Sequence, residues 1–217
     1  MVKRIVGISY SPAGGTALMT EMLAEEIADY LRECSPEKLD VECYDIADAH
    51  LAPTPDEETV VVLGMPVYVG KIPLPAIKAM RDIYGGSALT LGLVSYSGRN
   101  YGNALYELKQ FADERGFKMI GAGAMAVSYR AVRGSARSGA LVMDSDALRR
   151  YAKAASAKIM RLSGCEIEGL KVKPAPLEVK GRMPKHNISR LSPKAAAIAQ
   201  GVLDVIALRR QESEWFL

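Results

Sequence analysis

The feature that most constrains the fold is a regular alternation of short apolar runs with amphipathic stretches of helical spacing. Such alternation predicts a doubly wound α/β fold, in which right-handed crossovers join parallel strands. The third run, TVVVLGMPV, is apolar throughout, as expected of a strand that is buried on both faces. We therefore expect a five-stranded parallel sheet with helices on both faces, whose strands span residues 2–10, 39–46, 59–67, 88–96 and 117–129.

Helices are expected between these strands. Asp144 or Ser145 is a suitable N-cap for the longest of them, and Gly116 is placed to end another. The stretch ADAHLAPTPDEE is too rich in proline for a helix, so the crossover between the second and third strands should be irregular. The expected helices span residues 15–34, 74–83, 102–116 and 144–162.

The C-terminal part has a different character. We expect one domain over residues 1–165, followed over residues 166–217 by an extended basic arm and a helix at 192–211. The apolar end, Trp215 to Leu217, should dock on this domain or on a neighbour, which leaves a homodimer open. The basic residues of the arm are Lys171, Lys173, Lys180, Arg182, Lys185, Arg190 and Lys194.

Composition and charge narrow the classes of function. The 217 residues carry a formal net charge of +3, which is too small to indicate nucleic-acid binding. No stretch reaches the roughly 18 apolar residues of a membrane helix. We see no secretory leader, so we expect a cytoplasmic protein that does not bind membranes. Five residues are expected to be ordinary thiols or surface imidazoles: Cys34, Cys43, Cys165, His50 and His186.

The loop after the first strand, SPAGGT, has a composition that suits an anion. Its two glycines let the backbone curl closely around a ligand, and Ser11 and Thr16 offer hydroxyl donors. The following helix presents free amides and the positive end of its dipole, so a terminal phosphate would fit. No Gly-Lys-Ser/Thr follows, which excludes an ATPase loop. A plain strand–helix turn capped by Thr16 is the alternative.

Two more loops with tyrosines follow the third and fourth strands, GMPVYVGKIPLP and SYSGRNYGNAL. Tyr68 could cover a planar ring, and Tyr96 and Tyr101 could stack on one, although ordinary turns with rim tyrosines are the alternative. Ligands of doubly wound sheets bind beyond the carboxyl ends of the strands, where these loops lie. A phosphate loop beside two such loops suits flavin mononucleotide (FMN).

These three loops resemble those of flavodoxins. YSPAGGT resembles the flavodoxin phosphate loop. GMPVYVGKIP and VSYSGRNYGNALYEL resemble the second and third flavin loops of the flavodoxin-like domains that are fused to a ferredoxin in iron–sulfur flavoproteins. The resemblance covers roughly residues 3–163 and implies a flavodoxin-like fold, bound FMN and electron transfer.

The resemblance also implies roles for individual residues. Five would hold the phosphate: Ser11, Ala13, Gly14, Gly15 and Thr16. Three would flank the ring: Pro66, Val67 and Tyr68. Five would enclose its pyrimidine edge: Tyr96, Ser97, Gly98, Arg99 and Tyr101. Arg99 could neutralise the negative charge of reduced flavin and raise the second reduction potential; a solvated arginine that points away is the alternative.

The chain departs from the family pattern in three places. Ala13 replaces the usual threonine, which removes one hydroxyl donor and would weaken phosphate binding by about 1 kcal/mol. Ser97 and Gly98 replace a Gly-Asn pair at the ring edge. The cysteine-rich ferredoxin half is absent from this sequence, so electrons would pass to or from a separate partner.

We therefore expect an FMN-binding electron carrier whose partner is a redox protein such as a ferredoxin or a reductase. The basic arm could dock an acidic partner of this kind, or simply wrap the domain as a solvated tail. One alternative is an oxidoreductase, namely an NAD(P)H-dependent FMN reductase or quinone reductase on the same fold. Another is an interaction domain that has lost its flavin. No catalytic side chain and no metal site is expected in either the carrier or the interaction domain.

Overall fold

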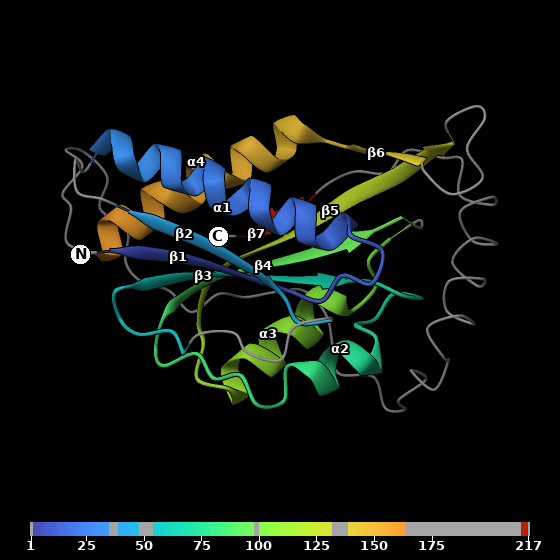
Figure 1. The fold of residues 1–217 in the computed structure, drawn as a ribbon, viewed down its shortest axis with the longest axis horizontal. Helices are drawn as coiled ribbons and strands as arrows, with labels where there is room; N and C mark the ends of the chain where they lie inside the picture. Colours follow the sequence, from blue (N-terminus) through green and yellow to red (C-terminus); the bar gives the residue numbers. More distant parts are fainter. Residues whose placement is uncertain are drawn as a thin grey trace.

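One mixed sheet forms the centre of the protein (Figure 1). The computed structural model describes residues 2–34, 39–47, 54–97, 100–131, 139–163 and 214–216. Within these residues the sheet has seven strands in the order β2-β1-β3-β4-β5-β6, and β7 also pairs with β5. The strands are β1 (Arg4–Ser9), β2 (Asp40–Asp45), β3 (Thr59–Pro66), β4 (Leu89–Tyr96), β5 (Lys118–Ala131), β6 (Gly139–Met143) and β7 (Glu214–Phe216).

The five strands that the sequence predicts all form, and they are parallel to one another. Their order, 2-1-3-4-5, is the doubly wound order of flavodoxin-like folds. The expected number of strands is wrong, however, because β6 and β7 add antiparallel pairs at the β5 edge. The sequence pattern predicts neither strand, and β7, with three residues, is shorter than the roughly four to eight residues of a recognisable strand pattern.

Helices cover both faces of the sheet (Figure 1). α1 (Gly15–Cys34) and α4 (Ser145–Leu162) lie on one face, and α2 (Leu74–Ala79) and α3 (Ala104–Glu114) lie on the other. The side chain of Asp144 caps α4 by accepting a 2.8 Å hydrogen bond from the amide of Ala147, as expected. No helix occurs in the described part of the crossover from β2 to β3, residues 46–47 and 54–58.

The core consists of two layers, one on each face of the sheet. Side chains alternate along each strand, so Ile5 of β1 faces α1 and α4, whereas Val6 faces α2 and α3. All eight residues of β3 are buried, which confirms the expectation that this apolar run is a central strand. Because β1, β3 and β4 are held on both faces, the loops at their carboxyl ends start from fixed positions.

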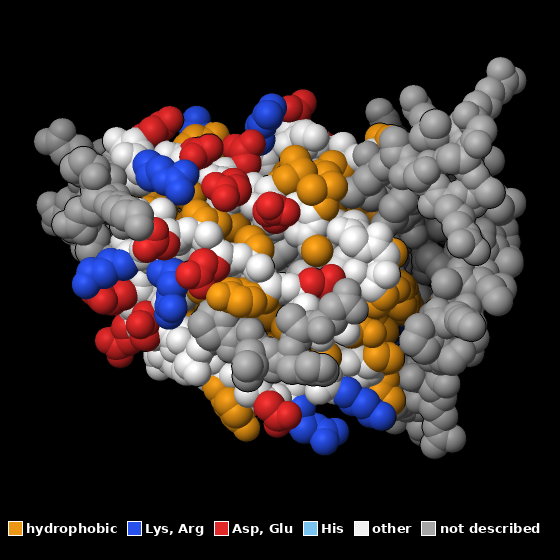
Figure 2. Space-filling model, in the orientation of Figure 1, with side chains coloured by type: hydrophobic (Ala, Val, Ile, Leu, Met, Phe, Trp, Pro, Cys, Tyr) orange, Lys and Arg blue, Asp and Glu red, His pale blue; other side chains and the backbone are white. Residues whose placement is uncertain are grey.

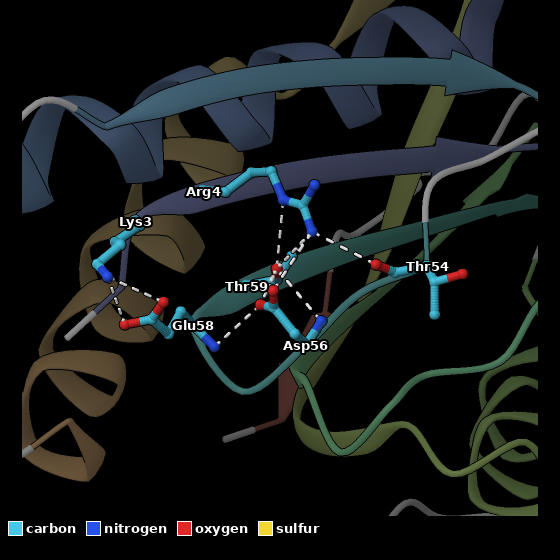
Figure 3. Close-up of polar contacts among 6 residues, drawn as sticks. All are labelled: Lys3, Arg4, Thr54, Asp56, Glu58 and Thr59. Atoms are coloured by element: carbon cyan, nitrogen blue, oxygen red, sulfur yellow. Dashed lines mark hydrogen bonds and ion pairs between the residues drawn. The ribbon is translucent and has the colours of Figure 1, made fainter.

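The amino edge of the sheet is held by a polar network (Figure 3). The Arg4 guanidinium donates to the Thr59 hydroxyl at 3.1 Å and lies 3.8 Å from an oxygen of Asp56. Thr59 in turn donates to Asp56 at 2.6 Å, and this bond, together with the amide of Glu58 and the charge of Arg4, lowers the pKa of Asp56. Lys3 forms an ion pair with Glu58 at 2.8 Å. The network ties β1 to β3 at the end of the sheet remote from the loops described below.

Almost all of residues 166–217, including the whole expected basic arm and the expected helix at 192–211, lie outside the described residues, as do His50, His186 and Cys165. The exception is β7, which pairs with β5 so that Ala122 is opposite Phe216 and Ala124 is opposite Glu214. The end of the chain therefore adds a strand to the sheet. None of the helices in the described ranges is long and apolar enough to cross a membrane.

Candidate functional site at the carboxyl edge of the sheet

The first loop (loop 1, residues 10–14) leads from β1 into α1 and turns tightly. The amide of Gly14 donates to the carbonyl of Ser11 at 2.9 Å, and Gly14 adopts a φ of +79°. This left-handed conformation favours glycine. A Cβ built on Gly14 would meet no atom within 4 Å, so the space on this side of the loop is open.

Loop 1 and the first turn of α1 present hydrogen-bond donors without acceptors in the described ranges. The amides of Gly15, Thr16 and Ala17, in the first turn of α1, have no acceptor in the described ranges. The hydroxyl of Ser11 is also unpaired, although Ser11 is only 6% exposed. Buried hydroxyls are nearly always hydrogen-bonded, so this orphan, in the loop that leads into free amides and the positive end of a helix, makes loop 1 a candidate site for an anion.

Asp45, the last residue of β2, orders loop 1. Its Oδ1 atom accepts hydrogen bonds from the amides of Ser11 and Ala47, both at 3.0 Å. The neighbouring Tyr10 is partly buried, and burial together with the charge of Asp45 raises the pKa of its phenol. The amide of Ser11 is thus already used, whereas its side chain remains available.

Thr16 connects the start of α1, directly after loop 1, to β4. Its hydroxyl lies 2.7 Å from the hydroxyl of Ser95, and both residues are buried. The Thr16 carbonyl accepts from the hydroxyl of Thr20 at 2.9 Å. Thr16 lies inside the first turn of α1, so it is not the N-cap of a plain strand–helix turn.

The second loop (loop 2, residues 67–73) contains a tight turn. Tyr68 and Lys71 exchange two backbone hydrogen bonds of 2.9 and 3.2 Å, and both central residues have positive φ, 55° at Val69 and 73° at Gly70. This is the pattern of a type I′ turn. A positive φ strains the backbone of a β-branched residue such as Val69. The Val69 side chain is 48% exposed.

The third loop (loop 3, residues 97–103) packs against loop 2 through two glycines. The carbonyl of Gly70 accepts from the amide of Asn103 at 2.9 Å. A Cβ on Gly102, whose φ is +57°, would lie only 2.4 Å from that carbonyl oxygen. The backbones of the two loops can approach this closely only because neither residue carries a side chain.

Glu107 of α3 strengthens this connection. Its Oε2 atom accepts a 2.9 Å hydrogen bond from the amide of Ile72. Burial raises the pKa of this half-buried carboxyl group, while the bond from Ile72 and the charge of Lys71 oppose the shift. Loops 2 and 3 and the start of α3 therefore form one connected unit.

The tyrosines expected at the ring occupy different environments. Tyr96 is only 4% exposed and belongs to the core, where its ring meets that of Tyr101 edge to face at 5.7 Å. Tyr68 and Tyr101 are half-buried at the surface. The buried ring of Tyr96 thus packs against the half-buried ring of Tyr101. Gly98 and Arg99 lie outside the described residues.

The remaining expected residues are distributed between the interior and the surface. Pro66, Val67, Gly15 and Thr16 are buried, Ser97 is half-buried, and Ala13 and Gly14 are exposed. The amide of Val67 donates to the carbonyl of Ser95 at 2.8 Å, so loop 2 is also fixed to the end of β4.

The rim of the site is partly apolar. Leu18, in the first turn of α1, is 43% exposed, and Val69 of loop 2 is 48% exposed. Figure 2 shows apolar side chains gathered toward this end of the visible face, whereas charged side chains crowd the amino end. In the ranges that the structure describes, no cluster of His, Cys, Asp and Glu could hold a metal ion.

Sequence reasoning missed Asp45, Ser95 and Glu107. Asp45 and Ser95 each lie one residue before the end of a predicted strand, so their positions carried a signal, whereas Glu107 lies inside a predicted helix. Their partners are distant along the chain, however: Asp45 binds Ser11 across 34 residues and Ser95 binds Thr16 across 79. Only the register of the sheet brings these pairs together.

Comparison with known proteins gives structural likeness alone. The chain matches no protein-family model and no curated protein. It is similar to the structure of an oxidoreductase from Corynebacterium diphtheriae, with a TM-score of 0.51 and 10% identity over 76% of this chain and 99% of that one. Similarity at this level of identity indicates a shared fold.

Two flavodoxins also align with the chain. One comes from the domain Archaea, with a TM-score of 0.46 and 15% identity over 72% of this chain and 98% of that one. The other, from Fusobacterium nucleatum and bound to FMN, has a TM-score of 0.42 and 11% identity over 74% of this chain and 99% of that one. The strand order and the shared fold together make this chain flavodoxin-like in architecture.

Proposed function

We propose that this protein binds FMN at the carboxyl edge of its sheet and transfers electrons through it. The observation that carries the proposal is the buried, unpartnered hydroxyl of Ser11 in a loop whose neighbouring amides are also free. Loop 1 leaves β1, whose two neighbours in the sheet are β2 and β3. The crossover from β1 leads to β2 on one side of the sheet, whereas the crossover from β3 leads to β4 on the other. The chain therefore changes direction between β1 and β3, and such a switch point is where doubly wound folds bind ligands.

The residues of loop 1 and α1 fit a phosphate group. The amides of Gly15, Thr16 and Ala17 would donate to its oxygens, and the hydroxyl of Ser11 would gain the acceptor that it lacks. The open space beside Gly14 would admit the group without displacing a side chain. Ala13 supplies no hydroxyl, so the backbone amides and Ser11 would carry most of the binding.

Loops 2 and 3 fit the planar part of the cofactor. Tyr68 and Tyr101 are half-buried and border the site, and the Gly70–Gly102 contact holds their loops at a fixed separation. When bound, FMN accepts and releases electrons on its ring system. The chain's part is to bind the ring, to limit the access of water, and to favour one oxidation state over another through the polar groups around it.

Visible absorption of the purified chain tests this proposal. FMN and riboflavin are added separately to the flavin-free protein, and each sample is then dialysed. We expect FMN to be retained with shifted bands and riboflavin to bind more weakly, because riboflavin lacks the phosphate. A protein that remains colourless with both ligands would overturn the proposal and favour the flavin-free interaction domain.

We further propose that a separate redox protein, such as a ferredoxin or a reductase, exchanges electrons with the bound flavin. The basic residues at 171–194 favour an acidic partner that is steered by charge. The rate of electron exchange between this partner and the bound flavin should fall as ionic strength rises. Oxidation of NADPH by the flavin-loaded chain alone would instead identify an independent reductase.

The loop sequences support a closer relation to the flavodoxin-like domains of iron–sulfur flavoproteins.

A further inference from the structure

Ser95 lies where the three loops of the candidate site meet. It is the second-last residue of β4 and is 7% exposed. Its hydroxyl contacts that of Thr16 at 2.7 Å, and its carbonyl accepts from the amide of Val67 at 2.8 Å. Loop 3 begins two residues later. One residue is therefore joined to the first turn of α1, which follows loop 1, and to loop 2, and it leads into loop 3.

The two hydroxyl groups have one spare proton between them. Each carries one hydrogen, and their mutual hydrogen bond uses one of the two. Either oxygen can be the donor in this pair. If Thr16 donates to Ser95, no hydrogen of Thr16 remains for a ligand. If Ser95 donates to Thr16, the hydrogen of the Thr16 hydroxyl is free.

An anion beside α1 would select between these two arrangements. A phosphate dianion only accepts hydrogen bonds, so it favours the arrangement in which the Thr16 hydroxyl donates outward. Ser95 must then donate to Thr16, and successive hydrogen bonds in such a chain strengthen one another. Thr16 lies in the first turn of α1 next to the free amides, so its hydroxyl would add to the same set of donors.

We propose that Ser95 is a positioning residue that orients the Thr16 hydroxyl toward the phosphate of the cofactor. This inference rests on the proposed function. It assigns to Ser95, a residue of β4 outside the phosphate loop, part of the preference for a phosphorylated flavin over one that lacks the phosphate. Removing the Ser95 hydroxyl should therefore weaken phosphate recognition without changing the contacts of the ring.

The test is a double-mutant cycle of Ser95→Ala and Thr16→Val, with dissociation constants measured for both FMN and riboflavin. Thr90→Val is the matched control, because Thr90 is also a buried hydroxyl of β4 but bonds to Ala88 at the opposite end of the strand. Melting temperatures of the flavin-free variants show whether each one folds. Thr16→Ser, which keeps the hydroxyl, provides a second route if Ser95→Ala does not fold.

We expect Ser95→Ala to weaken FMN binding about tenfold and riboflavin binding less than twofold. Adding Ser95→Ala to Thr16→Val should then cause no further loss, because Ser95 acts through Thr16. Thr16→Ser should keep the ratio of the two constants, and Thr90→Val should change neither.

Equal weakening of both flavins, or independent losses in the double mutant, would overturn the role of Ser95. Equal FMN-to-riboflavin ratios in Thr16→Ser and Thr16→Val would also overturn it. Failure of the unmodified chain to bind FMN would instead overturn the proposed function itself.

Discussion

Ser11 and Ser156 both bury a hydroxyl that has no hydrogen-bond partner in the described part of the chain. Ser11 belongs to loop 1, whereas Ser156 lies on the buried face of α4. Their chemistry is the same and their positions differ, so they form a natural pair of variants.

Ser11→Ala should weaken FMN binding by about 1 to 2 kcal/mol, because it removes a hydrogen bond to a charged group. Ser156→Ala should leave FMN affinity unchanged. Each flavin-free variant is titrated with FMN, and the quenching of flavin fluorescence gives its dissociation constant. Equal affinity in Ser11→Ala and the unmodified chain would show that this hydroxyl does not contact the ligand.

Glu107 should make the protein less stable as pH rises. Its pKa is raised in the folded state by burial, so the folded chain holds this proton more tightly than the unfolded chain. The stability that it contributes is complete below the unfolded pKa and is lost as pH rises through the folded pKa. Glu107→Gln keeps an acceptor for the amide of Ile72 but cannot ionise.

The Gln variant should therefore gain stability relative to the unmodified chain as pH rises from acid to neutral, and the two should converge at acid pH. Urea unfolding of both proteins across this range measures the difference. A difference that does not change with pH would contradict this assignment.

Asp56 should have the opposite pH dependence. Its pKa is lowered, first by the bond from Thr59, so the stability it contributes is present above the unfolded pKa and is lost as pH falls through the folded pKa. Asp56→Asn should be less stable than the unmodified chain at neutral pH, and the deficit should vanish in acid. The side chain is 65% exposed, so solvent screening keeps the effect small. Denaturant unfolding in parallel with Glu107→Gln tests the contrast in sign.

At the scale of elements, loops 2 and 3 behave as one unit because two glycines meet. Gly102→Ala would place a Cβ 2.4 Å from the carbonyl oxygen of Gly70 and would also strain a φ of +57°. We expect a loss of about 2 to 3 kcal/mol in the free energy of unfolding, together with weaker flavin binding.

Gly116→Ala is the control for this substitution, because Gly116 has a similar φ of +72° but open space around it. It should lose only about 1 kcal/mol, from backbone strain alone, and should keep its flavin affinity. Thermal unfolding and FMN titration of both variants separate strain from the close contact. Equal losses in the two variants would mean that the contact between the loops contributes nothing.

At the scale of the whole molecule, the two edges of the sheet differ. β2 is at one edge and carries Asp40, Glu42 and Asp45, which discourage pairing with another chain. At the other side, β5 is covered by β6 over Val127–Ala131 and by β7 over Ala122–Ala124. β7 thus supplies backbone hydrogen-bond partners for the part of the β5 edge at Ala122–Ala124.

Deletion of residues 214–217 should lower the melting temperature and increase aggregation, because it uncovers the edge of β5. Deletion of Leu217 alone leaves all the paired residues and should have little effect. Differential scanning calorimetry with light scattering measures both outcomes. An unchanged melting temperature in the longer deletion would indicate that β7 does not stabilise the sheet.

The sequence by itself determined the parallel sheet and the places of the three loops. Strand runs and helical spacing are local patterns, and in a doubly wound fold every loop that follows a strand lies at the same edge. Loop 1 could be predicted for the further reason that its glycines and hydroxyls are adjacent in the chain.

Only the tertiary structure decided which residues act together. The pairs Thr16–Ser95, Ser11–Asp45 and Gly70–Gly102 depend on strand order, on register and on how closely the loops pack, which no local pattern encodes. The burial of Tyr96 and the addition of β6 and β7 to the β5 edge were decided in the same way. The physical reason is that these contacts join segments far apart in sequence, and their geometry exists only once the whole sheet has formed.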